Sequence, residues 1–319
     1  MSKYTRQPLD FAGLKTVSLH ERGGKVTRAH FATPYRKGSG VSGWLDSLPH
    51  LLAGDQFRAV VEALVEARAR QRAIIWGLGG HVIKCGLTPV LIDLMERGYA
   101  TAFALNGSSS IHDFELALAG QTSEDVEAVL PDGRFGSAEE TGRYMNTAIV
   151  EGDRAGVGMG EALGAWLCSS TAAEPLVGLL SEAYRHSTPV TVHVAIGTDT
   201  PHTHPAADAG AIGRATHRDF RLFAALVADL HEGGVYLNVG SAVVLPEVFL
   251  KAVSAVRNLG HPLGGFTTVN MDFLQHYRPR VNVVERPHAG GAGGKGYALT
   301  GHHELMIPLL AAALIEKDA

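Results

Sequence analysis

Hydrophobic positions change their spacing repeatedly along the chain, between short apolar runs and longer stretches in which apolar residues recur every three or four positions. The first pattern is typical of buried strands and the second of amphipathic helices. The predicted strands cover residues 72–77, 100–105, 189–197, 235–240 and 265–270, and the predicted helices cover 54–71, 85–98, 174–187, 217–234, 246–260 and 303–316, with the segment 280–286 before the last helix. Because strands alternate with long helices, we expect an α/β fold with right-handed crossovers and a mostly parallel sheet.

The first part of the chain has no such pattern. Residues 1–50 contain Gly23-Gly24, Pro34 and a Gly-Ser cluster at 38–43, which are typical of irregular structure. We therefore expect residues 1–50 to form an N-terminal arm, and residues 51–319 to form a single α/β domain.

Composition and charge limit the class of protein. The chain has 319 residues, of which 45% are hydrophobic and 19% charged, which suffices for one large core. Its formal charge of -4 gives no electrostatic reason to expect nucleic acid or an anionic membrane as a partner. The two cysteines, Cys85 and Cys168, allow no disulfide framework. With neither a signal-peptide profile at the start nor a long apolar run elsewhere, we expect a cytoplasmic protein.

Small and polar residues follow five of the predicted strands directly. In a parallel sheet, ligands bind outside the carboxyl ends of the strands, so we expect these residues to lie in one neighbourhood. The strand ends are Gly77-Leu78-Gly79-Gly80-His81, Asn106-Gly107-Ser108-Ser109, Gly197-Thr198-Asp199-Thr200, Asn238-Val239-Gly240-Ser241 and Asn270-Met271-Asp272. A strict G-x-G-x-x-G dinucleotide motif is missing, and Gly158-Met159-Gly160 with Gly164 indicates close helix packing instead.

The turn at 106–110 is the most informative of these strand ends. A strand ends in Asn106-Gly107-Ser108-Ser109-Ser110, and a helix that carries His112, Asp113 and Glu115 begins at once. Backbone N–H groups at such a helix N-terminus suit a phosphate or another anion. Ordinary turn chemistry and helix capping would use the same residues, and both interpretations stay open here.

Several segments together resemble the deoxyhypusine synthase family. The similarity runs through GLGGHVIKCGLTPVLIDLMERG, ATAFALNGSSSIHDFELAL, STPVTVHVAIGTDT, YLNVGSAVV, FTTVNMD and HELMIPLLAAALIE, and covers about residues 55–316. The resemblance implies a Rossmann-like, doubly wound sheet with helices on both faces, in a homotetramer that binds NAD. It also implies oxidation of a polyamine such as spermidine, capture of its aminobutyl group as an imine on a lysine, and transfer to an acceptor amine.

Site residues follow from the same resemblance. The positions that would face NAD are Gly79, Gly80, His81, Asn106, Gly107, Ser108, Asp113, Asp199, Gly240, Ser241 and Asn270. Lys295, in GAGGKGYAL, is the candidate for the imine-forming lysine, which needs desolvation or a cationic neighbour to lose its proton. A solvated lysine on a flexible loop is the alternative for Lys295.

The chain departs from the family at the expected catalytic positions. Leu245-Pro246-Glu247 stands where the family has Lys-His-His, Gly294 replaces the tryptophan before the lysine, and Gly301 or His302 replaces a late aspartate. We therefore expect an NAD-dependent transferase that acts on a polyamine or related amine; its acceptor is unknown, and a small amine such as putrescine or agmatine is favoured.

The sixteen histidines support a second interpretation. His202, His204, Asp199 and Asp208 lie close together in sequence and carry metal-ligating side chains, although without the helical spacing of known zinc motifs. A metal-assisted hydrolase or lyase is thus one alternative, and a non-catalytic nucleotide-binding protein is another.

Overall fold

A six-stranded parallel sheet is the centre of the molecule within residues 3–170, 178–291 and 293–318, which the computed structural model describes. The strands lie in the order β3-β2-β1-β4-β5-β6. Their bounds are β1 Ile74–Leu78, β2 Ala102–Asn106, β3 Val190–His193, β4 Val235–Val239, β5 Thr267–Asp272 and β6 Lys295–Thr300. The chain has an α/β, Rossmann-like fold, and the prediction of this fold class is confirmed.

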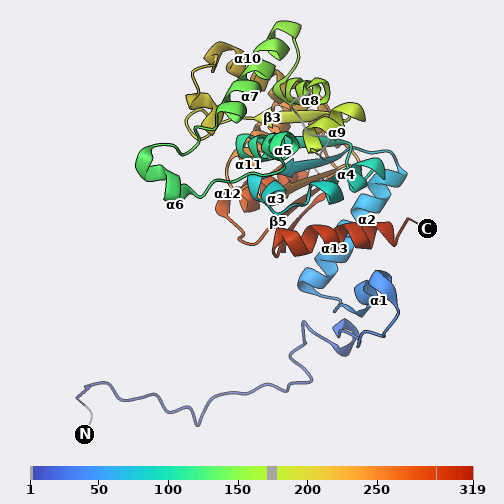
Figure 1. Cartoon of the computed structure of the whole chain (residues 1–319). Coiled ribbons are helices and arrows are strands. Elements are labelled where there is room, and N and C mark those ends of the chain that lie inside the picture. The colour runs from blue at the N-terminus through green and yellow to red at the C-terminus, as the bar shows by residue number, and fades with distance from the viewer. Residues whose placement is uncertain (1–2, 171–177, 292, 319) are drawn as a thin grey trace.

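Helices cover both faces of this sheet, because successive side chains of a strand point to opposite sides. Ile74, Trp76 and Leu78 of β1 enter one buried cluster, while Ile75 enters another. The second cluster takes side chains from the end of α10 Ala209–Ala228 and from α11 Val244–Asn258. The helices that contribute to the first cluster include α2 Leu52–Ala69, α4 Thr88–Glu96, α5 Gly107–Ala119, α7 Glu139–Ala155, α8 Met159–Ser169, α9 Leu179–Arg185 and α13 His303–Ile315. Figure 1 shows the helices around the sheet.

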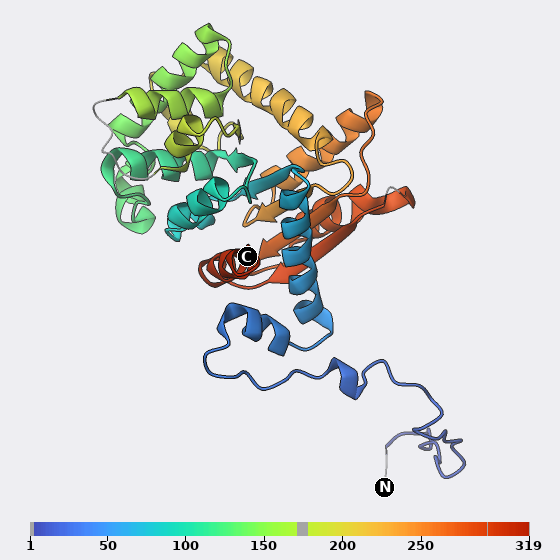
Figure 2. The same ribbon diagram turned by 90° about the vertical axis from the view of Figure 1, so that its right-hand side faces the viewer.

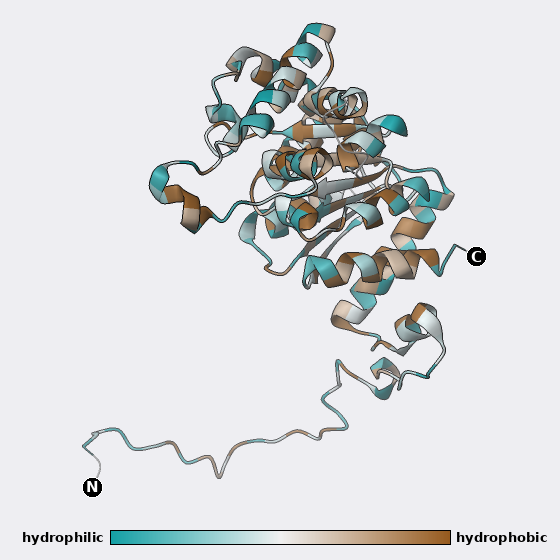
Figure 3. Cartoon of the chain, viewed as in Figure 1, coloured by the Kyte–Doolittle hydropathy of each residue, from teal (hydrophilic) through white to brown (hydrophobic). Residues whose placement is uncertain are grey.

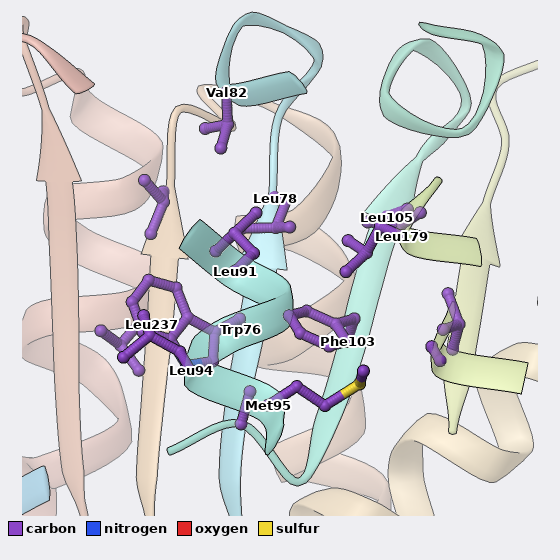
Figure 4. Packing of buried hydrophobic residues seen from close by; sticks show 14 of the residues in the cluster. Trp76, Leu78, Val82, Leu91, Leu94, Met95, Phe103, Leu105, Leu179 and Leu237 are labelled. Carbon is purple, nitrogen blue, oxygen red and sulfur yellow. The ribbon is translucent and has the colours of Figure 1, made fainter. Parts of the chain in front are cut away.

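Large side chains fill the space between α4 and the sheet. Figure 4 shows the apolar side of α4, with Leu91, Leu94 and Met95, next to Trp76 and Phe103. These three residues share one face because they are three and four positions apart. Burying a side chain of this size contributes about 1.5 to 3 kcal/mol, so this layer is a main source of stability. Figure 3 shows hydrophobic residues along the strands and mixed polarity on the helices.

The sheet has a sixth strand that was not predicted from the sequence. The segment 280–286 is helical, as η4 Arg280–Glu285 followed by η5 Arg286–Gly291, after the one-turn α12 Tyr277–Pro279. The edge strand is instead β6, which pairs with β5 from Thr267 with Lys295 to Asp272 with Thr300. Glycines on both sides of Lys295 hid this strand, because glycine has low strand propensity and marks loops.

The N-terminal segment runs away from the domain. Residues 3–39 are mostly irregular apart from η1 Arg28–His30, and both Figure 1 and Figure 2 show this segment projecting from the sheet. Contact with the domain begins at α1 Gly40–Ser47, where Leu45 is buried and the Ser42 hydroxyl donates to Glu316 at 3.3 Å. The short helices α3 Gly80–Lys84, α6 Val126–Val129, η2 Leu130–Asp132 and η3 Thr200–Thr203 complete the described elements.

Two further sequence predictions concern helices. The predicted helix 174–187 is present as α9, although its first four positions lie outside the described residues. Close packing at Gly160 and Gly164 is confirmed, because Cβ atoms there would lie 2.0 Å from the Val190 carbonyl oxygen and 2.6 Å from that of Leu180. None of the helices in the described ranges combines the length and hydrophobicity that a bilayer-spanning segment needs.

Candidate functional site

The tips of β1, β2, β3 and β4 touch one another at the carboxyl edge of the sheet. A Cβ atom on Gly79 would lie 1.9 Å from the Gly240 carbonyl oxygen, and one on Gly80 would lie 2.1 Å from Ser108 Oγ. A Cβ atom on Gly107 would lie 2.1 Å from the Asp199 carboxylate. Four loops far apart in sequence therefore meet at positions where only glycine leaves room for the neighbouring loop.

The N-terminus of α5 is fixed at the centre of this edge. The Asn106 side chain accepts the N–H of Ser109 at 2.9 Å, which makes Asn106 the N-cap of α5. The Ser109 hydroxyl donates to the Leu78 carbonyl oxygen at 2.6 Å and thereby ties the tip of β2 to that of β1. Residues Gly107 and Ser108 form the first turn, where the helix dipole favours negative charge.

A cavity of about 220 Å³ lies beside this helix N-terminus. Its wall combines one cation with several acids and hydroxyls, and its polar lining includes Lys84, Ser108, His112, Glu115, Glu124, Thr198, Asp199 and Thr200. In the Rossmann strand order, the residues that follow β2 lie where the ribose of a dinucleotide binds. The cavity therefore has both the position and the polar groups for part of a nucleotide.

Hydrogen bonds hold two ionisable side chains of this cavity in place. Thr141 donates to Glu115 Oε1 at 3.0 Å, Thr122 donates to Glu115 Oε2, and the Thr122 hydroxyl is 2.7 Å from His112 Nδ1. Burial, and secondly the Lys84 ammonium, lowers the pKa of His112 to about 4. His112 is therefore neutral near pH 7 and serves the cavity as a hydrogen-bonding group rather than as a cation.

On the other side of α3, a second group of ionisable side chains faces α13. His81 Nδ1 is 2.9 Å from His303 Nδ1, and His303 Nε2 is 3.5 Å from Asp272 Oδ1. The Cys85 sulfur is 3.4 Å from His81 Nδ1. His303 is fully buried, whereas His81 is exposed at the edge of the site. We name His81, Cys85, Asp272 and His303 the histidine cluster.

The structure gives three of the predicted cofactor-binding residues other contacts. Asp113 is fully buried and accepts the N–H groups of Leu179 and Leu180, each at 2.8 Å, so it anchors α9 and does not face the strand tips. Asn270 lies inside β5, where its side chain accepts from Asn238 and donates to Gln275, both at 2.7 Å. Ser241 is also buried and accepts the N–H of Leu245 at 3.2 Å.

Lys295 lies at the amino ends of the strands, opposite the carboxyl ends where the strand tips meet. It is the first residue of β6, exposed and paired with Thr267 at the start of β5. At about 3.3 Å per residue, the length of β6 separates Lys295 from Thr300 by roughly 17 Å, which exceeds the reach of a lysine side chain. Lys295 therefore does not reach the strand tips of its own chain.

Three of the four proposed metal-ligating residues, Asp208, His204 and Asp199, serve local structure. Asp208 caps α10 by accepting the N–H of Ala211 at 2.9 Å, and His204 Nε2 is 3.1 Å from Glu139. Asp199 Oδ2 accepts the N–H of Ala195 at 3.0 Å. Throughout the described residues, no three His, Cys, Asp or Glu side chains are grouped closely enough to hold a metal ion.

Sequence reasoning found the strand tips but missed several side chains around them. Lys84 is four residues after Gly80, and Cys85 is four residues after His81. In a helix, the two members of each pair share a face, and the two faces adjoin. That spacing was the available signal. The pairing of His303 with Asp272 had no local signal, because these residues are adjacent only through the register of β5 and β6.

Comparisons with known proteins agree on the fold. No protein-family model matches the sequence, and no curated protein does. A conserved LOR/SDH protein from Methanococcus maripaludis is 15% identical with a TM-score of 0.51, over 84% of this chain and 71% of that one. AgrE, solved in a ternary complex with ornithine and NAD+, is 17% identical with a TM-score of 0.50, over 84% of this chain and 34% of its own.

These similarities concern the fold, since each identity is below one fifth. The chain spans about a third of the length of AgrE. A deoxyhypusine synthase structure from Entamoeba histolytica is 11% identical with a TM-score of 0.48, which is too low to establish the family that the sequence motifs resemble.

Proposed function

We propose that this chain is an NAD-dependent enzyme that acts on an amine. The observation that carries the proposal is the contact of Gly79, Gly107 and Gly240 with neighbouring loops at the carboxyl edge of a sheet in the order 3-2-1-4-5-6. In such a sheet the strand order reverses beside β1, which is where dinucleotides bind. AgrE, which shares the fold, has been solved with ornithine and NAD+, and this adds support.

The residues at the strand tips fit an NAD molecule. The first turn of α5 and the Ser108 hydroxyl offer hydrogen-bond donors to a phosphate that adjoins the ribose, and Lys84 on the same cavity wall offers a positive charge. Glu115 and Asp199 offer acceptors for ribose hydroxyls. When bound, NAD can accept a hydride from the substrate carbon. The protein has to orient both molecules and remove a proton from the ammonium group of the substrate.

Binding measurements with the full chain test this proposal. We expect calorimetry to detect NAD binding, and Lys84→Gln to weaken it about tenfold or more, since it removes a charge-assisted contact. Lys251→Gln, on the exposed side of α11, is the matched control and should bind NAD like the wild type. Absence of binding, or equal weakening by both variants, would contradict the assignment of the cavity.

Turnover separates an enzyme from a non-catalytic nucleotide-binding protein. Primary amines, among them ornithine, putrescine and spermidine, are incubated with NAD and the protein, and NADH absorbance is recorded. We expect NADH to form with at least one amine. Binding of NAD without NADH from any amine would favour the non-catalytic alternative.

Aminobutyl transfer through an imine on Lys295 is the finer form of the proposal, and it rests on the sequence resemblance. Since Lys295 lies at the far edge of its own sheet, this reaction needs Lys295 from a second copy, as in the homotetramer that the resemblance implies. Borohydride reduction in the presence of NAD and spermidine, followed by peptide mass spectrometry, tests it. An adduct on Lys295 supports aminobutyl transfer. Unmodified Lys295 would contradict transfer through this lysine and would favour amine oxidation without transfer.

A further inference from the structure

The histidine cluster has a preferred arrangement of protons. His303 Nε2 is 3.5 Å from Asp272 Oδ1, which is longer than a normal hydrogen bond. Among the described residues, this buried ring nitrogen has no other hydrogen-bond partner. A carboxylate favours a protonated nitrogen beside it and disfavours a lone pair. His303 in its neutral form therefore carries its proton on Nε2, and its Nδ1 is a lone pair.

This tautomer of His303 determines that of His81. The two Nδ1 atoms are 2.9 Å apart, a hydrogen-bond distance that requires one donor and one acceptor. Because Nδ1 of His303 is the acceptor, Nδ1 of His81 carries the proton and donates it. His81 Nε2 is then left as a lone pair on an exposed ring at the edge of the site.

Burial keeps the inner ring uncharged. Burial lowers the pKa of His303, and the nearby Asp272 only partly opposes this effect. A glycine is required above the ring, since a Cβ atom on Gly240 would lie 2.8 Å from His303 Cε1. The strand tip of β4 thus covers the inner histidine and fixes its plane.

We propose that His81 is the general base that removes a proton from the ammonium group of the substrate, with His303 and Asp272 as positioning residues. This inference rests on the proposed function, because it supplies the proton acceptor that amine oxidation needs. In the step, an N–H bond of the ammonium group breaks and its electron pair stays on the substrate nitrogen. The proton forms a bond with Nε2 of His81, whose positive charge is stabilised through His303 by Asp272.

The surroundings of His81 suit a cation. The Phe273 ring is 42% exposed, its centroid is 5.7 Å from that of His81, and the His302 ring stacks on it at 6.0 Å, so a partly exposed aromatic ring borders the base. Glu304 is exposed in the first turn of α13, and its carboxylate is 3.9 Å from the Cys85 sulfur. An aromatic ring and a carboxylate in the surroundings of the base would favour a primary ammonium group over a neutral alcohol.

Cys85 is the other candidate for the reacting group in this cluster. Its thiol lies 3.6 Å from His81 Nε2. Burial, and secondly the Glu304 carboxylate, raises the pKa of Cys85, which keeps the thiol protonated near pH 7. The cysteine therefore lies beside the base without competing for the proton of the substrate.

Nitrogen NMR of the full chain tests the arrangement without substrate or NAD. In histidine-labelled protein at mildly alkaline pH, long-range correlations report which ring nitrogen is protonated, and His81→Gln identifies the His81 signals. We expect the proton on Nδ1 of His81 and on Nε2 of His303, and Asp272→Asn should remove this preference. A proton on Nε2 of His81 in the wild type would overturn the inference, as would unchanged tautomers in Asp272→Asn.

Kinetics test the role of the base in turnover. We expect His81→Gln to lower kcat for amine oxidation by about 10²- to 10⁴-fold, a much larger factor than its effect on the Kd for NAD. His261→Gln, at an exposed position after α11, is the matched control. Wild-type kcat in His81→Gln would overturn the inference. A wild type that forms no NADH from any amine would refute the proposed function instead, and the NMR result would still decide the tautomers.

Discussion

Gly79→Ala is the most direct test of how the strand tips meet. The new methyl group would lie 1.9 Å from the Gly240 carbonyl oxygen, whereas ordinary contacts begin near 3.4 Å. The tips of β1 and β4 would therefore have to separate by about 1.5 Å. The obstacle is a backbone atom, so no side-chain rotation can relieve it. The backbone angles of Gly79 suit alanine, which leaves the close approach as the cause.

The expected loss of stability follows from two contributions. Overpacking of this kind costs about 1 to 3 kcal/mol. Separation of the tips also stretches the hydrogen bond from Gly79 N–H to the Val239 carbonyl oxygen, now 2.8 Å, which contributes roughly 1 kcal/mol. We therefore expect the free energy of unfolding to fall by about 2 to 4 kcal/mol.

Urea denaturation followed by circular dichroism measures this change. Gly213→Ala is the matched control, because Gly213 is an exposed position of α10 where a Cβ atom meets nothing within 4 Å, and it should raise stability by up to about 1 kcal/mol. The reasoning is refuted if the free energy of unfolding of Gly79→Ala lies within about 0.5 kcal/mol of the wild-type value, which is the range of ordinary surface substitutions.

Three further predictions concern the core, the pH dependence and the far edge of the sheet. Trp76→Phe should lower the free energy of unfolding by about 1 to 3 kcal/mol, because it leaves the buried Tyr99 carbonyl without the indole N–H that donates at 2.8 Å; denaturation measures this, and an unchanged midpoint contradicts it. Burial raises the pKa of Asp219 to about 7, so the native state holds a proton that the unfolded chain releases near pH 4, and this contribution to stability is present below pH 4 and lost as the pH rises through 7. Relative to Asp219→Asn, the wild type should lose roughly 4 kcal/mol between pH 4 and pH 8 in denaturation titrations, and parallel pH curves would refute this. Lys295→Ala should leave the Kd for NAD unchanged by calorimetry, because Lys295 lies at the amino edge of β6; a large increase in Kd would show that Lys295 of another copy reaches the site.

The fold class could be predicted because its signals are local. Apolar runs such as 100–105, followed by an amphipathic stretch, identify strands and helices through side-chain spacing within a dozen residues. The rule that parallel strands share one carboxyl edge then placed Gly79, Ser108 and Gly240 together, and the structure agrees. The position of Lys295 at the start of β6 could not be predicted, because the flanking glycines masked this strand.

What the sequence by itself determined was the alternation of strands and helices and the positions of the small residues that end the strands. Only the tertiary structure decided which polar side chains are free to act. Asp113 follows the same strand tip as Ser108, yet its carboxylate is used by the N–H groups of α9, and this depends on helix packing across 66 residues of sequence. His303 and Asp272 form a pair because β6 lies beside β5, a register set by strand pairing and not by any local pattern. Propensities and periodicities act between neighbours in sequence, whereas the chemistry of a site depends on neighbours in space.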